Sequence, residues 1–242
     1  MNRVGALGAA ALGEALAHEA CSVRRLNLNS NTVGPEGAAA LARGLARSSA
    51  LETLILHNNQ VEDEGAAALA VALESPTCPL KELGLMNNGI GDSGAVALAS
   101  SLVTARESDS LLSLRVLGLG ANRIGASGAA ALAGALGLGA AVEELNLSHN
   151  PQVGDRGASA LATALEQRVS PEALHEEALH GEPFVYGEGL GVLYLTGAGV
   201  GAQGGRALLE ALETTSLGVL GLLGNRGVEE ETLKRIEALN LY

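Results

Sequence analysis

The feature that most constrains this chain is a repeat of about 28 residues that runs through nearly its whole length. Each copy begins with the pattern L-x-x-L-x-L-x-x-N-x-V, with occasional replacements, and the copies start at residues 23, 51, 80, 114, 142, 190 and 217. The intervals between these starts are 28, 29, 34, 28, 48 and 27 residues. Two intervals exceed the period, which predicts insertions near residues 103–113 and 166–189.

The two halves of each copy predict different secondary structure. The Leu-x-Leu alternation has a period of two, which is typical of a short strand with one buried side. Further along, Gly, Leu and Leu follow at intervals of four, as in Gly94, Leu98 and Leu102. In Ala-rich sequence this spacing places the leucines on one face of a helix. We expect the glycine to allow close approach to the strand layer and the Asn to bond the backbone of its turn.

Composition agrees with a thin and repetitive core. Of the 242 residues, 47% are hydrophobic but only 2% are aromatic, and 33 are glycine. An apolar fraction this high excludes a disordered chain. Because large rings are scarce, the core has to be built from small layers of Leu, Val and Ala.

The strand pattern, the Asn, the Gly and the paired helical leucines coincide at one period. In these respects the chain resembles the leucine-rich repeat family, specifically the ribonuclease-inhibitor-like class also found in NOD-like receptors and Ran GTPase-activating proteins. The resemblance covers about residues 4–240. It implies an α/β fold, a right-handed βα solenoid (the leucine-rich repeat horseshoe), with a parallel sheet on the concave face and helices on the convex face.

The repeat boundaries predict one leucine-rich repeat domain over residues 1–242. Residues 1–22 are expected to form an N-terminal half-repeat, and residues 23–228 seven strand-bearing repeats with the two insertions. Residues 229–242 are expected to form a C-terminal cap, because the charged segment EEETLKRIE would give it a polar outer face.

The acidic balance of the chain bears on its partners. A formal net charge of −12 argues against electrostatic binding to nucleic acid or anionic membranes and favours a basic or neutral protein partner. No stretch reaches about 18 uninterrupted apolar residues, so membrane insertion is not expected. Cys21 and Cys78 are too few for a disulfide framework, which favours a cytoplasmic location, including a cytoskeleton- or organelle-associated assembly.

The N-terminal sequence has a second interpretation. Residues 4–17 resemble the apolar core of a signal peptide behind Arg3. However, Glu14 and His18 interrupt this stretch, and its Gly and Leu spacing returns throughout the chain. We therefore interpret it as part of the folded array.

Two segments that spell GxGxxG, residues 89–94 and 199–204, would suit a dinucleotide fingerprint. The equivalent turns of other copies read TVGPEG, QVEDEG, RIGASG and QVGDRG, so the glycines belong to the repeat. No ribose-binding carboxylate ends the following strand, and we expect no cofactor. Glu172, His175 and Glu176 have helical spacing but favour a solvated helix over a metal site, and no catalytic motif is present.

The informative positions are those that flank the inner leucines and point out of the concave sheet. Clustered apolar side chains on such a face usually mark a contact. The predicted partner-binding residues on the strands are Ile55, Met86, Val116, Val192, Tyr194, Val219 and Leu223. The second insertion adds Phe184 and Tyr186, so we predict that residues 170–194 and the C-terminal concave strip form one binding surface. Alternatively, the curl of the sheet or the insertion covers these residues.

The function predicted from these features is a non-enzymatic protein-protein interaction module, either an adaptor or a structural subunit of a larger intracellular assembly. No attached NTPase, kinase or death-fold domain is expected. One alternative is a GTPase regulator similar to Ran GTPase-activating proteins, for which Arg25 lies near the expected early-repeat surface. Another is an acidic inhibitor of a basic enzyme, similar to ribonuclease inhibitor, although much of the acid lies at helix starts, where it complements helix dipoles.

Overall fold

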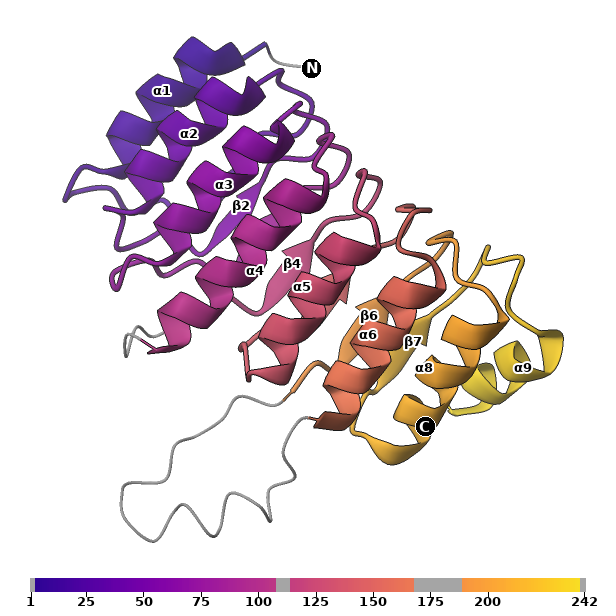
Figure 1. Cartoon of the computed structure of the whole chain (residues 1–242). Helices are drawn as coiled ribbons and strands as arrows, with labels where there is room; N and C mark the ends of the chain where they lie inside the picture. The colour runs from indigo at the N-terminus through magenta and orange to yellow at the C-terminus, as the bar shows by residue number, and fades with distance from the viewer. Residues whose placement is uncertain (1–2, 108–113, 168–188, 240–242) are drawn as a thin grey trace, which may run out of the picture.

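The computed structural model describes residues 3–107, 114–167 and 189–239, and in these residues short strands alternate with helices (Figure 1). The strands are β1 (Arg25–Asn27), β2 (Thr53–Ile55), β3 (Glu82–Gly84), β4 (Val116–Gly118), β5 (Glu144–Asn146), β6 (Val192–Tyr194) and β7 (Val219–Gly221). The helices are α1 (Gly5–Leu16), α2 (Gly34–Leu45), α3 (Glu62–Leu73), α4 (Asp92–Glu107), α5 (Ala126–Gly137), α6 (Gly154–Gln167), α8 (Ala202–Thr214) and α9 (Glu230–Leu239).

The strands form one parallel sheet in sequence order, and the repeat sets their register. The middle leucine of each strand lies opposite that of the next, from Leu26 opposite Leu54 to Leu193 opposite Leu220. From β2 to β7 these leucines are buried, whereas Leu26 is only half-buried because β1 is the edge strand of the described sheet. The predicted alternation of buried and outward-facing strand residues is confirmed.

The helices lie side by side over one face of the sheet, and each packs on the helices of adjacent repeats (Figure 1). Packed helices need about 8 to 10 Å each, while neighbouring strands lie about 4.8 Å apart. The helical side is therefore longer, and the array curves with the sheet on its concave face. This is the predicted α/β solenoid. Within the described ranges, no helix combines the length and apolar character needed to cross a membrane.

The glycine near each helix start is needed for a different close contact from the predicted one. A methyl group on Gly157 would lie 2.7 Å from Val153 Cγ1 and 3.0 Å from Ala129 Cβ, on the preceding helix α5. The tight contact is therefore between helices of successive repeats and with the residue four positions earlier. The expectation that these glycines allow close approach to the strand layer was wrong, because the atoms nearest to them belong to the neighbouring helix and to the residue four positions earlier.

Buried asparagines join each repeat to the one before it. Asn88 Oδ1 accepts hydrogen bonds from the N–H groups of Asn59 (3.0 Å) and Val61 (3.2 Å), and its Nδ2 donates to Leu56 O (2.9 Å). It also donates to Met86 O of its own turn, as predicted. Amide side chains in the neighbouring repeats bond in the same way, so we call the series Asn31, Asn59, Asn88, Asn122, Asn150 and Asn225 the asparagine ladder.

The ladder is interrupted at Ala198, where the sixth repeat has no amide. There, Val153 N–H donates to Asn150 O, and Gly154 N–H donates to Ala198 O. The turns of the fifth and seventh repeats, Asn150 to Val153 and Asn225 to Val228, are one residue longer than the other turns, and each satisfies part of its own backbone. Asn225 resumes the ladder by accepting from Val200 N–H (3.0 Å) and donating to Leu195 O (2.7 Å).

We expect Asn88→Ala to lower the free energy of unfolding by about 3 to 5 kcal/mol, because it leaves three buried backbone groups of the preceding repeat without partners. The neighbouring Asn87 is exposed and has a left-handed backbone (φ 54°), which glycine also adopts. Asn87→Gly should therefore change stability by less than about 1 kcal/mol. Urea unfolding followed by circular dichroism measures both, and equal losses would contradict the role of the ladder.

Candidate protein-binding surface

The concave face presents a grid of three outward positions per repeat, two on the strand and one after it. Parallel register aligns equivalent positions into columns that run across the sheet. The first column is Arg25, Thr53, Glu82, Val116, Glu144, Val192 and Val219. The second is Asn27, Ile55, Gly84, Gly118, Asn146, Tyr194 and Gly221. The third is Asn29, His57, Met86, Gly120, Ser148, Thr196 and Leu223.

Charged side chains are confined to the first five rows of this face. In the position before each strand, Arg24 and Lys81 both pair with Glu52, at 3.5 Å and 3.2 Å. In the next two rows, Arg115 pairs with Glu143 at 3.4 Å. These pairs are solvent-exposed, and they contribute little stability of their own. They do, however, line the N-terminal and central rows with charged residues in the position before each strand; we call this line of charges the ionic border.

The centre of the face has an apolar patch over a floor of glycine. Ile55, Met86 and Val116 are half-buried on three successive repeats. A methyl group on Gly84 would lie 3.0 Å from Ile55 Cδ1, and one on Gly120 would lie 3.4 Å from Met86 Cε. Ile55 and Met86 therefore lean toward the next row, where the missing side chains leave room for them.

His57 lies beside this patch, and the hydrogen bond that it accepts requires a neutral ring. Its Nδ1 accepts a hydrogen bond from Met86 N–H (3.1 Å), and its Cε1 lies over Gly84. Burial lowers the pKa of His57 below its usual 6.5, and the nearby carboxylate of Glu82 only partly opposes this. The neutral ring thus fixes the backbone at Met86.

The last two rows form an uncharged strip. Neither β6 nor β7 carries a charged residue, and Gly191 and Gly218 stand where earlier repeats carry charged residues before the strand. Val192 lies opposite Val219 in the sheet, and Val219 is 37% exposed. Leu223 follows β7 and is 70% exposed. An apolar surface that is open to solvent therefore occupies the C-terminal end of the concave face.

The structure brings together some of the predicted site residues and separates others. Val192, Tyr194, Val219 and Leu223 share the uncharged strip, and the Tyr194 ring lies over Gly221, with Cδ1 2.8 Å from the position of a methyl group there. The central patch of Ile55, Met86 and Val116 is separated from this strip by β5, which carries the polar Glu144 and Asn146. Phe184 and Tyr186 lie outside the described residues, as do Glu172, His175 and Glu176.

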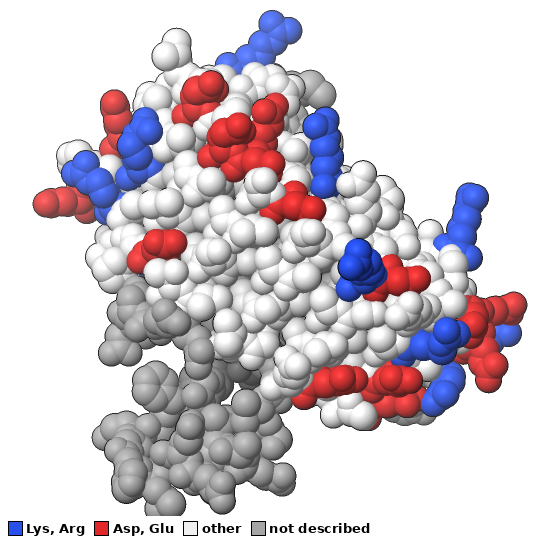
Figure 2. Space-filling view, in the orientation of Figure 1, with Lys and Arg blue, Asp and Glu red and all other residues white. Residues whose placement is uncertain are grey.

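Among the residues that the structure describes, the helical face offers no comparable surface. Figure 2 shows that carboxylates gather near both ends of the array, while few charged side chains lie over the middle helices. Large exposed apolar residues on this side are single and stand on different helices, such as Val71 on α3 and Val96 on α4. Scattered residues of this kind are normal on protein surfaces.

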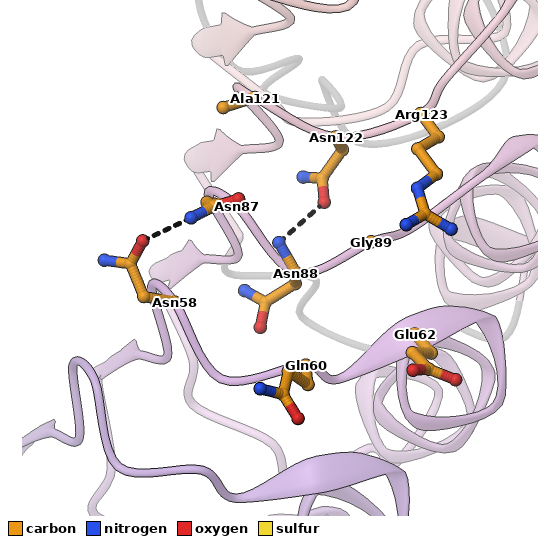
Figure 3. A pocket seen from close by; sticks show the side chains of 9 residues that line it. All are labelled: Asn58, Gln60, Glu62, Asn87, Asn88, Gly89, Ala121, Asn122 and Arg123. Carbon is orange, nitrogen blue, oxygen red and sulfur yellow. Dashed lines mark hydrogen bonds between the residues drawn. The ribbon is translucent and has the colours of Figure 1, made fainter.

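A polar pocket lies at the edge of the sheet, where the strands turn toward the helices (Figure 3). It is lined by Asn58, Gln60, Glu62, Asn87, Asn88, Gly89, Ala121, Asn122 and Arg123. Asn87 Nδ2 donates to Asn58 Oδ1 (2.6 Å), and Asn88 N–H donates to Asn122 Oδ1 (2.9 Å). The four asparagine side chains that line this pocket are thus engaged with one another or in the asparagine ladder.

The GxGxxG segments also have a structural role. Gly91 and Gly94 N–H both donate to Asp63 Oδ1 of the preceding repeat (2.7 and 3.0 Å), and Gly201 and Gly204 bond Asp155 in the same way. Each aspartate therefore caps the helix of the following repeat. A methyl group at these glycines would approach the carboxylate to 3.3 Å or less, which explains the second and third glycines of each motif. In the part of the chain that the structure covers, no three His, Cys, Asp or Glu residues are grouped for a metal ion.

Comparison with known proteins agrees with this architecture. The sequence profile described as "Leucine Rich repeat" matches residues 19–42, 47–70, 78–99, 110–133 and 142–162. The chain belongs to the leucine-rich repeat family. The ribonuclease-inhibitor-like class stays a prediction from the repeat length. No curated protein sequence matches the chain.

Two solved structures share the fold. Leiomodin-1 Actin-Binding Site 2 is 16% identical, with a TM-score of 0.51 over 69% of this chain and 91% of that one. A chain in the crystal structure of the Rad7 and Elc1 complex from yeast is 18% identical, with a TM-score of 0.59. That match covers 89% of this chain but 47% of the other, so this chain spans about half of its length.

We expect the stability of the fold to fall as the pH drops below 6.5, the usual pKa of histidine. Because His57 has a lowered pKa in the folded chain, the unfolded chain takes up the proton first, and each further drop favours unfolding until the folded pKa is reached. Urea unfolding between about pH 8 and pH 5 measures this. His57→Gln should lose part of the pH dependence, and a variant with the same pH dependence as the wild type would contradict the assignment.

Proposed function

We propose that this chain is a non-enzymatic protein-protein interaction module, an adaptor or a structural subunit of a larger assembly, and that it binds its partner through the concave face. The observation that carries the proposal is the uncharged strip on β6 and β7, where Leu223 and Val219 stand exposed beside Val192 and Tyr194. Apolar surface of this kind, held on a rigid sheet, is typical of contacts between proteins.

The similar structures support protein binding as the role of this scaffold. One is described as an actin-binding site and the other as part of a complex with Elc1. Because their sequence identity to this chain is low, they support a shared fold that can bind proteins, and they do not indicate which protein binds here. The insertion near residues 166–189, with Phe184 and Tyr186, joins α6 to β6 and is proposed as a second element of the surface.

A cytoplasmic location suits this role. The two cysteines of the chain, Cys21 and Cys78, are too few for a disulfide framework, which supports a reducing compartment. Arg25, on which the GTPase-regulator alternative depends, is exposed on the edge strand β1. A single exposed arginine is ordinary, so the interaction module is the function that the surface favours.

The double variant Val219→Asp, Leu223→Asp should weaken binding of the captured partner at least tenfold, which corresponds to about 1.4 kcal/mol. The new carboxylates would have to lose their water when the strip is covered. The partner would first be identified by affinity purification with the wild-type chain. Its dissociation constant for each variant would then be measured by titration calorimetry.

Val71→Asp on helix α3 is the matched control, because Val71 is 69% exposed and Leu223 is 70% exposed. This control should bind the partner like the wild type, and all variants should keep the wild-type circular dichroism. Unchanged affinity in the double variant, or an equal loss in the control, would refute binding through the concave strip.

A further inference from the structure

Two carboxylates flank an apolar residue in the middle of the concave face. Glu82 on β3, Val116 on β4 and Glu144 on β5 occupy the same column, because the parallel register places them opposite one another. With neighbouring strands about 4.8 Å apart, the two glutamate Cα atoms lie about 9.5 Å apart across Val116. Both glutamates are half-buried, and neither forms a salt bridge within the described residues.

The cations nearest to this column along the chain are engaged elsewhere. Lys81 pairs with Glu52 (3.2 Å), and Arg115 pairs with Glu143 (3.4 Å) and also donates to Ala141 O (3.2 Å). Across β2 to β5 and the residues just before them, four carboxylates face two cations, and the one further cation that pairs with this set, Arg24, contacts Glu52 (3.5 Å) and neither Glu82 nor Glu144. His57, which lies near Glu82, adds no positive charge at neutral pH because burial lowers its pKa. The centre of the concave face thus carries uncompensated negative charge.

The floor beside Val116 is open and apolar. The position of a methyl group on Gly118 has only Gly84 Cα (3.7 Å) and Leu83 O (3.8 Å) as near neighbours. Further along the same repeat, Met86 Cε covers Gly120 (3.4 Å), where Asn146 Oδ1 and Ser148 O (3.3 Å each) form the polar end of this floor. From Val116 to Gly118 is about 6.6 Å along the strand, which is close to the length of an extended arginine side chain. An aliphatic stem can therefore lie on this floor while its charged end reaches the carboxylates.

We propose that the face formed by Glu82, Val116 and Glu144 takes an arginine side chain of the partner protein. This inference rests on the proposed binding through the concave face. The guanidinium lies on Val116 between the two carboxylates, and its methylene stem crosses Gly118 toward Met86. Arginine fits better than lysine, because its planar group has five donors, holds its water weakly and can bond two carboxylates at once.

The test uses the capped peptide acetyl-Gly-Arg-Gly-amide as the probe, with methyl-labelled protein observed by NMR. Peptides with lysine or with the neutral isostere citrulline in place of arginine are the comparisons. We expect the arginine peptide to shift the Val116 and Met86 methyl signals about threefold more than the citrulline peptide at equal concentration, because only arginine forms charge-assisted hydrogen bonds. Equal shifts for arginine and citrulline, or for arginine and lysine, would overturn the proposal.

Paired variants locate the site. In Glu82→Gln, Glu144→Gln the arginine shift should fall to the citrulline level, whereas Glu36→Gln, Glu166→Gln, which neutralises two exposed carboxylates on helices α2 and α6, should keep it. An undiminished shift in the first variant would overturn the proposal. The Val219→Asp, Leu223→Asp variant should keep the shift while it loses the partner. If the wild type shows no shift but the partner still responds to Leu223, this inference fails and the proposed function stands.

Discussion

The asparagine ladder is the interaction on which the rest of the structure depends. One buried amide satisfies two N–H groups and one carbonyl of the preceding repeat, and these groups lie in a turn that is too tight to pair with itself. Buried backbone groups without partners are costly, so the ladder fixes how each repeat sits on the last. Strand register, the line of middle leucines and the columns of the concave face all follow from that placement.

Because the scaffold is held from within, the outward positions of the concave face are free to differ in chemistry. Replacing a second- or third-column residue by glycine, as at Gly84 or Gly120, lets a side chain of the previous row lean across the gap. Removing charge from the position before the strand, as at Gly191 and Gly218, leaves β6 and β7 without an ionic border. One scaffold thereby carries an acidic centre and an uncharged end, separated by β5.

Most of the fold could be predicted from the sequence, because the repeat is local in each copy. Leu-x-Leu and the leucines spaced by four determine the strand and helix of every described repeat. What the sequence did not reveal are contacts between copies. The asparagine bonds reach back by 25 to 37 residues, and Asp63 caps a helix that starts about 30 residues later. The same reason explains the site: Glu82 and Glu144 were not predicted to act together, because they meet only through β4.

The interruption at Ala198 connects the scaffold to the binding surface. Between the fifth and sixth repeats no amide bridges the turns, and the junction depends on β5–β6 pairing, on packing of α6 against α8 and on the carboxylate of Asp155, which holds Gly201 and Gly204 N–H at 2.7 and 2.8 Å. Asp63 makes the same contact with Gly91 and Gly94 where the ladder is intact, so the aspartate bond is the part of the junction that the loss of the amide leaves in place. The uncharged strip begins at this junction, directly after the longest interval of the repeat. The longest interval and the broken ladder therefore separate the same two repeats, and the uncharged strip is the part of the concave face that follows both.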